Sequence, residues 1–400
     1  MKTDTKLKRP FDVTIVGGLG HVGLPLGLVF AKKGLKVCLY DLDAKKAKLV
    51  KKGVMPFIEY GAEPVLRKTL KNRKLTVSNS IISVSKARYV VIAIGTTIDE
   101  LLNPRVRSFL ECFEEIRKHL RKDQTVIVRS TVYPHTCRRM FKLLGGDRSW
   151  RVAYCPERIV QGHAVKELCE LPQIVAGMTD EAVEDAARLF GRISPKIIKV
   201  PMEAAELIKL FSNAWRYIQF AVTNQFYMIA HSYGIDYDKV REAMVEEYGR
   251  AANLPTAGFA AGPCLLKDTM QLEAFYGTKF FLGHAAMMVN EGLPGFIVDD
   301  MKNRYDLSIT RVGILGMAFK ADIDDTRDSL SYKLGKILRF YGATVYYSDE
   351  YAQDPTFVPK EKLIESSDVI IVGVPHSQYR ELVIPKSKEV IDLWGAVKRI

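Results

Sequence analysis

A hydrophobic run near the start of the chain leads into three spaced glycines, in the order Val13-Thr14-Ile15-Val16-Gly17-Gly18-Leu19-Gly20-His21-Val22-Gly23. A G-x-G-x-x-G pattern between a strand and a helix is typical of a dinucleotide-binding turn. We expect Gly18 to permit the tight turn, Gly20 to let the backbone approach a pyrophosphate, and Gly23 to let the helix pack on the strand. His21 and Val22 lie between these glycines, so we place them in the same cofactor site.

The sequence after this turn supports the assignment. An apolar helical pattern at 24–31 ends near Gly34, and a second strand pattern at 37–40 is closed by Asp41. An acid at this distance from the first glycine accepts hydrogen bonds from a ribose diol and repels a 2′-phosphate. We therefore predict NAD as the cofactor in preference to NADP. The alternative is a glycine-rich turn that binds no ligand. It is disfavoured because the strand, the glycines, the helix and the acid all occur in the expected order.

The alternation of strand and helix patterns continues beyond Asp41. The apolar run at 89–94 is typical of a buried parallel strand and ends at Gly95-Thr96, where the carboxyl edge of the sheet would face the cofactor. The strand pattern at 125–128 runs in the same way towards Thr131, which we also place at the cofactor. We therefore predict an α/β fold class with a Rossmann-type, doubly wound NAD-binding domain over residues 1–200.

The pattern then becomes helical. Residues 203–233 form one long helical pattern, and further helix follows to about residue 300, interrupted by a loop at 253–264. We predict a central helical region at 201–303. Long helices of this kind commonly supply a dimer interface.

An α/β pattern resumes at 304–400 and repeats the order of the first domain. Val312-Gly313-Ile314-Leu315-Gly316 is followed by Met317-Ala318-Phe319-Lys320, so the three-glycine fingerprint is missing. Approach to a pyrophosphate through the backbone alone is then lost, and Lys320 and Arg327 could supply positive charge instead. We predict a smaller Rossmann-like domain that binds a nucleotide different from NAD.

Composition and charge narrow the classes of function. The 400 residues are 48% hydrophobic, and the formal net charge is +13 with a pI near 9.3. The basic residues are spread along the chain without an arginine-rich tract or an aromatic RNA-binding signature, so we predict no nucleic-acid partner, and an anionic small substrate fits this charge as well. The chain has no apolar run long enough for a bilayer, and residues 1–10 lack a signal-peptide core, which predicts a cytoplasmic protein without membrane contact.

Six cysteines are scattered without a C-x-x-C pair or a cysteine–histidine cluster of zinc spacing, so we predict no metal site. Cys264 differs from the others because it lies in a loop of small residues and is followed by Lys267 and Asp268. If a helix begins near Cys264, its terminal N–H groups favour the thiolate and Asp268 lies one turn along. An inert buried cysteine is the alternative for this residue.

Two further groups of polar residues could take part in catalysis. Lys209 and Asn213 are spaced i and i+4, so they share a helix face on which they could stabilise an oxyanion or hold a water; an exposed polar stripe is the alternative. Glu157 follows a strand end on the presumed carboxyl edge, and a surface salt bridge is its alternative. Taken with Cys264, these residues indicate a dehydrogenase with a thiol nucleophile, which an NAD enzyme needs only when it oxidises past the aldehyde.

With these motifs in place, the chain resembles the UDP-glucose/GDP-mannose dehydrogenase family, whose members oxidise the 6-hydroxymethyl group of a nucleotide sugar to a carboxylate with two NAD. The resemblance extends over almost the whole chain. The segments that carry it follow the family's order and are residues 18–26, 130–134, 155–158, 206–213, 264–268, 315–320 and 325–329.

The resemblance implies a role for each matching residue. Cys264 corresponds to the thiol nucleophile. The groups that hold a water and stabilise oxyanions, some of them also in contact with the substrate, correspond to Lys209, Asn213, Asp268, Thr131 and Glu157. Lys320 and Arg327 correspond to residues that bind the nucleotide sugar. Arg250 corresponds to an arginine that reaches the substrate of the neighbouring subunit, which implies a homodimer acting on a UDP-sugar.

Three features bear on the sugar and on the loop that would hold it. The family's glycine-rich approach to the cysteine is replaced here by Phe259-Ala260-Ala261-Gly262-Pro263, in which the proline removes an N–H and stiffens the backbone. The segment 154–162, followed by Glu167-Leu168, is similar to the branch that oxidises UDP-N-acetylhexosamines. The resemblance therefore implies UDP-N-acetylmannosamine or UDP-N-acetylglucosamine as substrate. Leu266-Lys267-Asp268 is more similar to the UDP-glucose branch, so UDP-glucose is the alternative.

Two other classes of function share part of this sequence pattern. A two-electron hydroxyacid dehydrogenase has a Rossmann half and a helical second domain, but it needs neither a thiol nor a third α/β domain. A non-enzymatic nucleotide-sensing module would keep the glycine turn and Asp41 without the polar residues that accompany Cys264.

Overall fold

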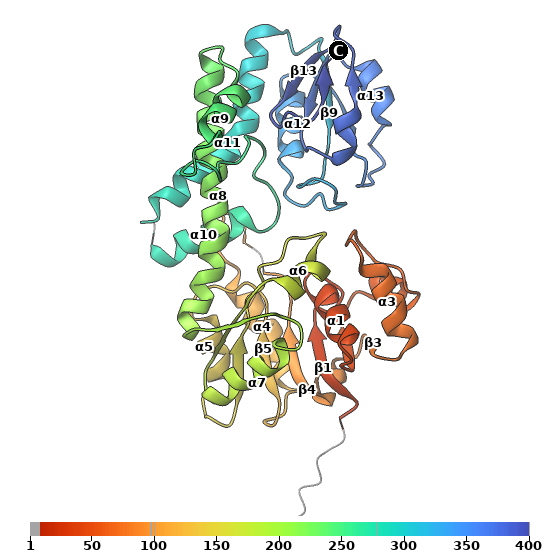
Figure 1. The fold of residues 1–400 in the computed structure, drawn as a ribbon, viewed down its shortest axis with the longest axis vertical. Helices are drawn as coiled ribbons and strands as arrows, with labels where there is room; N and C mark the ends of the chain where they lie inside the picture. Colours follow the sequence, from red (N-terminus) through yellow and green to blue (C-terminus); the bar gives the residue numbers. More distant parts are fainter. Residues whose placement is uncertain (1–8, 97, 100, 278, 400) are drawn as a thin grey trace, which may run out of the picture. The chain divides into compact units, whose positions relative to one another are not determined.

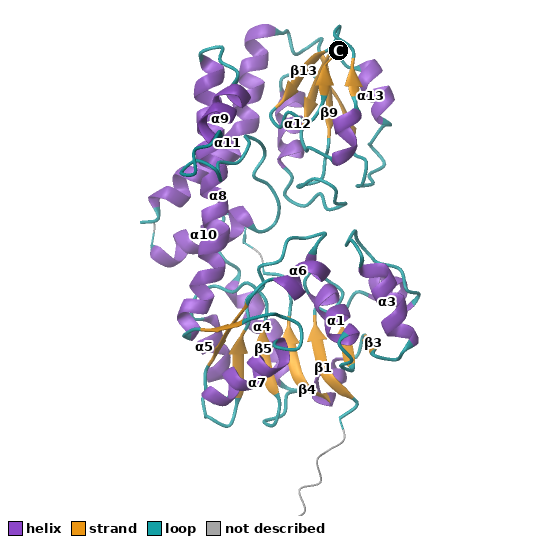
Figure 2. Cartoon of the chain, in the orientation of Figure 1, coloured by secondary structure: helices purple, strands orange, loops and turns teal. Residues whose placement is uncertain are grey.

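The computed structural model describes residues 9–96, 98–99, 101–277 and 279–399. The chain divides into two compact units, Met1–Phe211 and Ser212–Ile400. The first unit and the C-terminal part of the second each contain a sheet accompanied by helices, and the segment between them is helical (Figure 1; Figure 2).

The first unit is built on an eight-stranded sheet. Its strands are β1 Phe11–Val16, β2 Val37–Tyr40, β3 Leu75–Ser78, β4 Ala87–Ile92, β5 Thr125–Val128, β6 Arg151–Tyr154, β7 Gln173–Gly177 and β8 Ile197–Lys199. They follow the order β3-β2-β1-β4-β5-β6-β7-β8, and neighbours are parallel except for β6 and β7. The order reverses between β1 and β4, which is the switch point of a doubly wound sheet, so the predicted Rossmann-type fold is confirmed.

Helices cover both faces of this sheet because its strands are apolar at successive positions and alternate residues point to opposite faces. Ile15 and Val91 pack in one core with α1 (Gly23–Lys32), whereas Val90 and Val126 pack in other clusters with α4 (Val106–Arg117). The other helical segments of this unit are α2 Ala44–Lys51, α3 Ala62–Lys71, η1 Ile81–Lys86, α5 Thr136–Leu143, α6 Ala164–Glu170 and α7 Asp180–Phe190.

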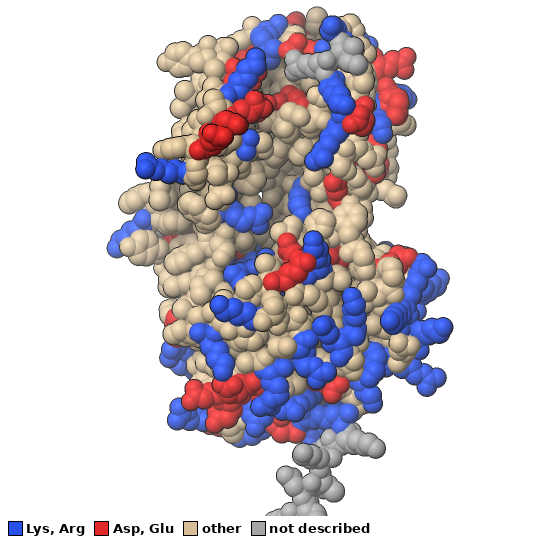
Figure 3. Space-filling view, viewed as in Figure 1, with Lys and Arg blue, Asp and Glu red and all other residues tan. Residues whose placement is uncertain are grey.

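Many of the basic residues lie at helix ends of the first unit. Lys32, Lys71 and Arg117 fall in the last turns of α1, α3 and α4, where a cation is stabilised by the helix dipole. Figure 3 shows Lys and Arg side chains gathered over this unit. Part of the +13 charge is therefore explained by basic residues that stabilise helix ends. Within the described part of the chain, no helix combines the length and the apolar character that a bilayer span requires.

The central region is organised by the long helix α8 (Met202–Ser232), which matches the predicted pattern at 203–233 to within a residue. It is followed by α9 Tyr237–Val245, α10 Leu265–Tyr276 and α11 Phe281–Arg304. Two buried amides join these elements: Asn224 Nδ2 donates to Asn290 Oδ1 at 2.9 Å, and Asn290 Nδ2 donates to the Tyr217 carbonyl at 2.9 Å. Asn224 also pairs with both backbone polar groups of Gly258, which fixes the loop before Cys264 to α8.

A four-stranded parallel sheet forms the C-terminal part of the second unit. Its strands, in the order β10-β9-β11-β13, are β9 Arg311–Leu315, β10 Thr344–Ser348, β11 Val369–Val372 and β13 Glu389–Asp392. The remaining elements are α12 Leu330–Phe340, α13 Lys360–Ser366, η2 Ser377–Glu381, β12 Val383–Ile384 and β14 Lys398–Arg399. The predicted smaller Rossmann-like part is confirmed. The division into three domains stays a prediction, since the boundary between the two compact units falls inside α8.

Candidate active site

The glycine turn joins β1 to α1, and steric demands explain its glycines. Gly17, rather than Gly18, takes the left-handed conformation of the turn, with a φ of 74°. A Cβ on Gly18 would come within 2.8 Å of Leu39 Cα, and one on Gly23 within 2.2 Å of the Gly17 carbonyl oxygen. A Cβ on Gly20 would meet only that oxygen, at 3.6 Å, among the described atoms nearby. The expectation for Gly18 is therefore corrected: Gly17 makes the turn, and Gly18 allows close contact with β2.

Asp41 closes this site from the end of β2. Its carboxylate accepts hydrogen bonds from the backbone N–H groups of Leu19, at 2.9 Å, and Asp43, at 3.0 Å. The acid and the glycine turn are therefore held together as one structure. The open backbone at Gly20 fits the pyrophosphate of NAD, and the Asp41 carboxylate fits its ribose diol.

The remaining residues predicted at the cofactor lie in the turn and in the loops after β4 and β5. Val22 is the N-cap residue of α1, and the ring of His21 packs on that of Phe57 with 3.9 Å between centroids. Thr96 Oγ1 donates a hydrogen bond to the Thr131 carbonyl at 2.7 Å, which joins the two loops. Their contact with NAD stays a prediction.

Lys209 and Glu157 come together in the first unit. Lys209 is 5% exposed on α8, and its Nζ lies 4.0 Å from Glu157 Oε2. Glu157 lies in a turn that follows β6. The buried Arg129 guanidinium holds this turn by donating hydrogen bonds to the carbonyls of Cys155 and Pro156, at 3.0 and 3.2 Å. Burial lowers the pKa of Arg129, and the nearby Glu157 carboxylate acts in the opposite direction. Sequence reasoning missed Arg129, although a charged residue directly after a buried strand was the available signal.

Cys264 and its polar neighbours come together in the second unit. Cys264 is the exposed N-cap residue of α10, and its carbonyl accepts from the Asp268 N–H at 2.9 Å. The Asp268 carboxylate is fully buried and accepts from Asn213 Nδ2 at 2.5 Å, while Lys267 Nζ lies 3.0 Å away. Because Asn213 and Lys209 are both buried, the alternative of an exposed polar stripe does not apply to them.

Cys264 also differs from the buried cysteines. Burial raises the pKa of Cys38 to about 11 and that of Cys155 to about 12, so these thiols stay protonated near neutral pH. The thiol at the start of α10 is instead exposed and lies near helix N–H groups that stabilise a thiolate. The alternative of an inert buried cysteine therefore does not describe Cys264.

The loop that leads to Cys264 packs on the loop between β9 and α12. Gly262 has a φ of 98°, and its N–H donates to the Asp328 carbonyl at 3.2 Å. A Cβ on Gly262 would come within 2.4 Å of the Phe319 ring, so only glycine fits there. Pro263 follows this contact and further restricts the backbone before the thiol.

The loop between β9 and α12, residues 317–329, carries both basic residues predicted to bind the nucleotide. Arg327 makes a bidentate ion pair with Asp325, with 2.6 Å between Nη2 and Oδ2, and this hydrogen bonding raises the pKa of Arg327. Lys320 lies on the same loop, and the arginine side chain is 57% exposed. Their contact with a nucleotide stays a prediction.

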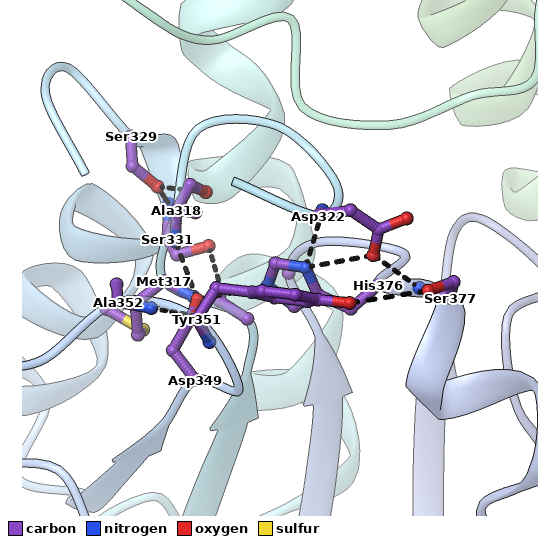
Figure 4. A network of polar contacts seen from close by, with 12 residues as sticks. Met317, Ala318, Asp322, Ser329, Ser331, Asp349, Tyr351, Ala352, His376 and Ser377 are labelled. Carbon is purple, nitrogen blue, oxygen red and sulfur yellow. Dashed lines mark hydrogen bonds and ion pairs between the residues drawn. The ribbon is translucent and has the colours of Figure 1, made fainter. Parts of the chain in front are cut away.

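The start of this loop is fixed by Asp349 at the end of β10. One carboxylate oxygen accepts from the N–H groups of Met317 and Ala318, at 2.6 and 2.8 Å, and also faces His376 Nε2 at 3.1 Å (Figure 4). Burial acts to raise the pKa of Asp349, but the hydrogen bonds from His376 and from backbone N–H groups outweigh it and lower the pKa to about 2. No sequence motif indicated His376, which is paired here with residues distant along the chain.

Arg250 lies in the turn between α9 and α10, away from regular structure. Its side chain is exposed, and the guanidinium carbon is 5.9 Å from the centroid of the Tyr248 ring. Its predicted role in the site of a neighbouring subunit stays a prediction. Among the described residues, no group of three His, Cys, Asp or Glu side chains is placed to hold a metal ion.

The acid-closed glycine turn and the exposed thiol at the start of α10 indicate the class of NAD-dependent dehydrogenases. Family models support this class along nearly the whole chain. The NAD binding domain of the UDP-glucose/GDP-mannose dehydrogenase family matches residues 11–193, its central domain matches 203–292, and its UDP binding domain matches 313–399. The chain therefore belongs to the UDP-glucose/GDP-mannose dehydrogenase family, and its cofactor is NAD.

Individual relatives agree with this assignment. A UDP-N-acetyl-D-mannosamine dehydrogenase of Pyrococcus horikoshii is 27% identical over 377 residues, which cover 91% of this chain and 90% of the relative. A GDP-mannose 6-dehydrogenase of Pseudomonas putida is 27% identical over 428 residues, with 96% of each chain covered.

Solved structures show the same fold. The UDP-D-ManNAc dehydrogenase structure from Pyrococcus horikoshii superimposes with a TM-score of 0.88 at 26% identity, covering 97% of this chain and 96% of the other. A UDP-glucose dehydrogenase from Pyrobaculum islandicum also has a TM-score of 0.88, at 24% identity, covering 98% of this chain and 96% of the other. At that identity the second likeness concerns the fold.

Proposed function

We propose that this protein oxidises the C6 hydroxymethyl group of a UDP-sugar to a carboxylate, with two NAD reduced per sugar and Cys264 as the covalent nucleophile. The main support is the exposed thiol at the N-terminus of α10, accompanied by the buried Asp268–Asn213 pair. The match of the C-terminal part to a UDP binding domain supports a UDP-linked substrate.

The covalent part of the reaction begins at the aldehyde oxidation level. The Cys264 thiolate adds to the carbonyl carbon, a C–S bond forms, and the π electrons move to oxygen as an oxyanion. Lys209, as a buried cation on α8, is proposed to stabilise that oxyanion by donating a hydrogen bond. NAD, held at the glycine turn and Asp41, would supply the hydride acceptor for both the alcohol and the thiohemiacetal.

Hydrolysis of the resulting thioester frees the enzyme. Water adds to the thioester carbon, the C–S bond breaks, and the sulfur leaves as the thiolate with a carboxylate as product. Asn213, Asp268, Thr131 and Glu157 are proposed to orient the water and the oxyanion. The alcohol and one water thus give the carboxylate, two hydrides and three protons, so atoms and charge balance.

UDP-N-acetylhexosamine is the favoured substrate. The relatives named above include a UDP-N-acetyl-D-mannosamine dehydrogenase, and a second relative with that name, from Methanocaldococcus jannaschii, is 26% identical over 370 residues. UDP-glucose remains the alternative because the residues after Cys264 resemble that branch. Lys320 and Arg327 are proposed to bind the nucleotide part, which is common to both substrates.

We further propose that the protein is a homodimer formed through α8. Side chains spaced along one face of this helix are apolar and exposed: Trp215 is 61% exposed, and Val222, Phe226 and Ile229 follow at intervals of seven, four and three residues. Apolar residues repeating in this way on an uncovered helix face are typical of a helix–helix interface. Arg250 is proposed to reach the substrate of the partner subunit.

A panel assay tests the proposed substrate. The protein is incubated with NAD and UDP-N-acetylmannosamine, UDP-N-acetylglucosamine or UDP-glucose, and NADH and product mass are measured. We expect two NADH for each UDP-uronic acid formed, with the highest kcat/KM on an N-acetylhexosamine. Preference for UDP-glucose would select the alternative substrate, and one NADH per product would contradict the four-electron reaction.

A further inference from the structure

His376 bridges the end of β10 and the loop 317–329, although it belongs to neither. It follows β11, and its side chain is 0% exposed. Nδ1 accepts a hydrogen bond from the backbone N–H of Asp322 at 2.9 Å, and Nε2 lies 3.1 Å from Asp349 Oδ2 (Figure 4). A backbone N–H can only donate, so Nδ1 is the unprotonated nitrogen and Nε2 donates to Asp349. Both ring nitrogens of His376 are thus hydrogen-bonded.

Asp322 lies in the middle of this loop in an unfavourable backbone conformation. Its φ is 59°, in the left-handed region that a non-glycine residue rarely adopts. Two contacts with the segment after β11 hold it there: its N–H donates to His376, and its carboxylate accepts from the Ser377 N–H at 2.8 Å. Asp322 follows Lys320 by two residues and precedes Arg327 by five, so the same contacts fix the middle of the segment between the two basic residues.

The two ends of the loop are held by other contacts. Asp349 accepts from the first two N–H groups of the loop, and the carbonyl of Asp328 near its end accepts from Gly262. The bond from the Asp322 N–H to His376 fixes the middle together with the bond from the Ser377 N–H to the Asp322 carboxylate. A loop already ordered before binding loses less conformational entropy when the ligand arrives, which increases affinity.

We propose that His376 is a positioning residue for UDP, which orders the segment from Lys320 to Arg327 by accepting the Asp322 N–H bond. This inference rests on the proposed binding of a UDP-sugar by the C-terminal part of the chain. The bond to Asp349 sets the tautomer of the ring, and the bond to Asp322 sets the conformation of the loop.

Two substitutions separate these bonds. The oxygen of an asparagine amide stands two bonds from Cβ, as Nδ1 does, so His376→Asn can keep the bond from Asp322 and loses the bond to Asp349. The terminal amide atoms of glutamine stand three bonds from Cβ, as Nε2 does, so His376→Gln can keep the bond to Asp349 and loses the bond from Asp322. Both variants replace a ring by an amide, so they are matched in polarity.

The test measures the Kd for UDP alone and the hydrogen exchange of the Asp322 amide in the full chain. We expect His376→Asn to bind UDP within about threefold of the wild type, and His376→Gln to bind at least tenfold more weakly with exchange at least tenfold faster, as expected for loss of one hydrogen bond. The Kd for NAD should be the same in all three proteins, because NAD binds to the first unit.

Other outcomes overturn the inference. Equal UDP affinity in both variants would show that the loop bond does not position the nucleotide. A loss of UDP affinity that only parallels a fall in melting temperature would lead to the same conclusion. Wild-type protein that does not bind UDP would contradict the proposed function itself and, with it, a role for His376 in binding. The exchange rates of the two variants would then still show whether His376 orders the loop.

Discussion

Asp41 and Asp349 hold equivalent places in the two Rossmann-like sheets and have different partners. Each follows the strand beside the first strand of its sheet, and each accepts an N–H from the loop after that first strand. Both residues are partly exposed, but the Asp349 side chain itself is buried and paired with His376. The acid thus holds a loop in both sheets, and in the first it is also predicted to bind the ribose of NAD.

The first prediction concerns Asp41. Replacement by alanine removes a charged acceptor for the ribose diol and also the bond from the Leu19 N–H. We expect Asp41→Ala to weaken NAD binding by about 1–3 kcal/mol. Titration of the variant with NAD measures this change, and UDP affinity serves as the control that should not move. An unchanged Kd for NAD would remove Asp41 from the cofactor site.

The second prediction concerns Asp349 and pH. A carboxyl group whose pKa is lower in the folded chain stabilises it above the unfolded value, and this stability is lost as the pH falls towards the folded value. With a pKa of about 2 against 3.8, Asp349 contributes about 2 kcal/mol that disappears between about pH 5 and pH 1. Hydrogen exchange of the β10 amides should show this loss in the wild type and a smaller one in Asp349→Asn. Equal acid sensitivity in the two proteins would contradict it.

At the scale of elements, α8 has two different faces. One buries Glu206, Lys209 and Asn213, and the other exposes Trp215 and further apolar residues. The buried Glu206 carboxylate accepts hydrogen bonds from the N–H groups of His135 and Cys137, at 2.6 and 2.9 Å. These groups lie at the start of α5, so Glu206 caps that helix. The helix thus combines a structural cap with two predicted catalytic residues.

The third prediction concerns the exposed face of α8. A charge at the centre of an apolar dimer interface must be buried without a partner, so Trp215→Glu should convert a dimer into monomers. Light scattering coupled to size-exclusion chromatography measures this. Lys239→Glu is the matched control, because Lys239 is 82% exposed on α9 and its variant should remain dimeric. A monomeric wild type, or an unchanged dimer in Trp215→Glu, would contradict an α8 interface.

The fourth prediction concerns the loop before Cys264. Gly262→Ala introduces a Cβ that collides with the Phe319 ring, at a φ that alanine rarely adopts. We expect acid formation to fall by at least tenfold while NAD affinity is unchanged. Gly292→Ala is the control, because the space around Gly292 in α11 is open and alanine favours a helix. If both variants kept full activity, the contact between the two loops would not matter for the thiol.

At the scale of the whole molecule, the sequence predicts what depends on local pattern. Apolar runs located the strands and the long helical period located α8, and the helix start that was considered near Cys264 is present as the start of α10. The turn glycine was assigned to Gly18 instead of Gly17, because the two adjacent glycines are equivalent in the sequence pattern, whereas in the folded chain Gly17 is the left-handed residue and lies against Ala93. Pattern alone could not distinguish the two glycines.

Contacts between distant segments could not be predicted from the sequence. His376 meets Asp349 and Asp322, which are 27 and 54 residues away, and Arg129 meets Gln173 across 44 residues. His376 meets Asp349 because parallel strands bring their carboxyl ends to one edge, whereas Gln173 reaches Arg129 because β7 runs antiparallel to β6 and begins where β6 ends. Local sequence carries no signal for which side chains meet there. Single polar residues of this kind therefore emerge only from the folded chain.

The central claim is that Cys264 acts as a covalent nucleophile in a four-electron oxidation. The most direct measurement is the amount of UDP-uronic acid and of trapped aldehyde formed by Cys264→Ala in the presence of a hydrazine, compared with the wild type. We predict that the variant binds NAD normally, forms acid several orders of magnitude more slowly, and yields a hydrazone of the aldehyde. Formation of the acid by Cys264→Ala at a rate near that of the wild type would contradict the claim.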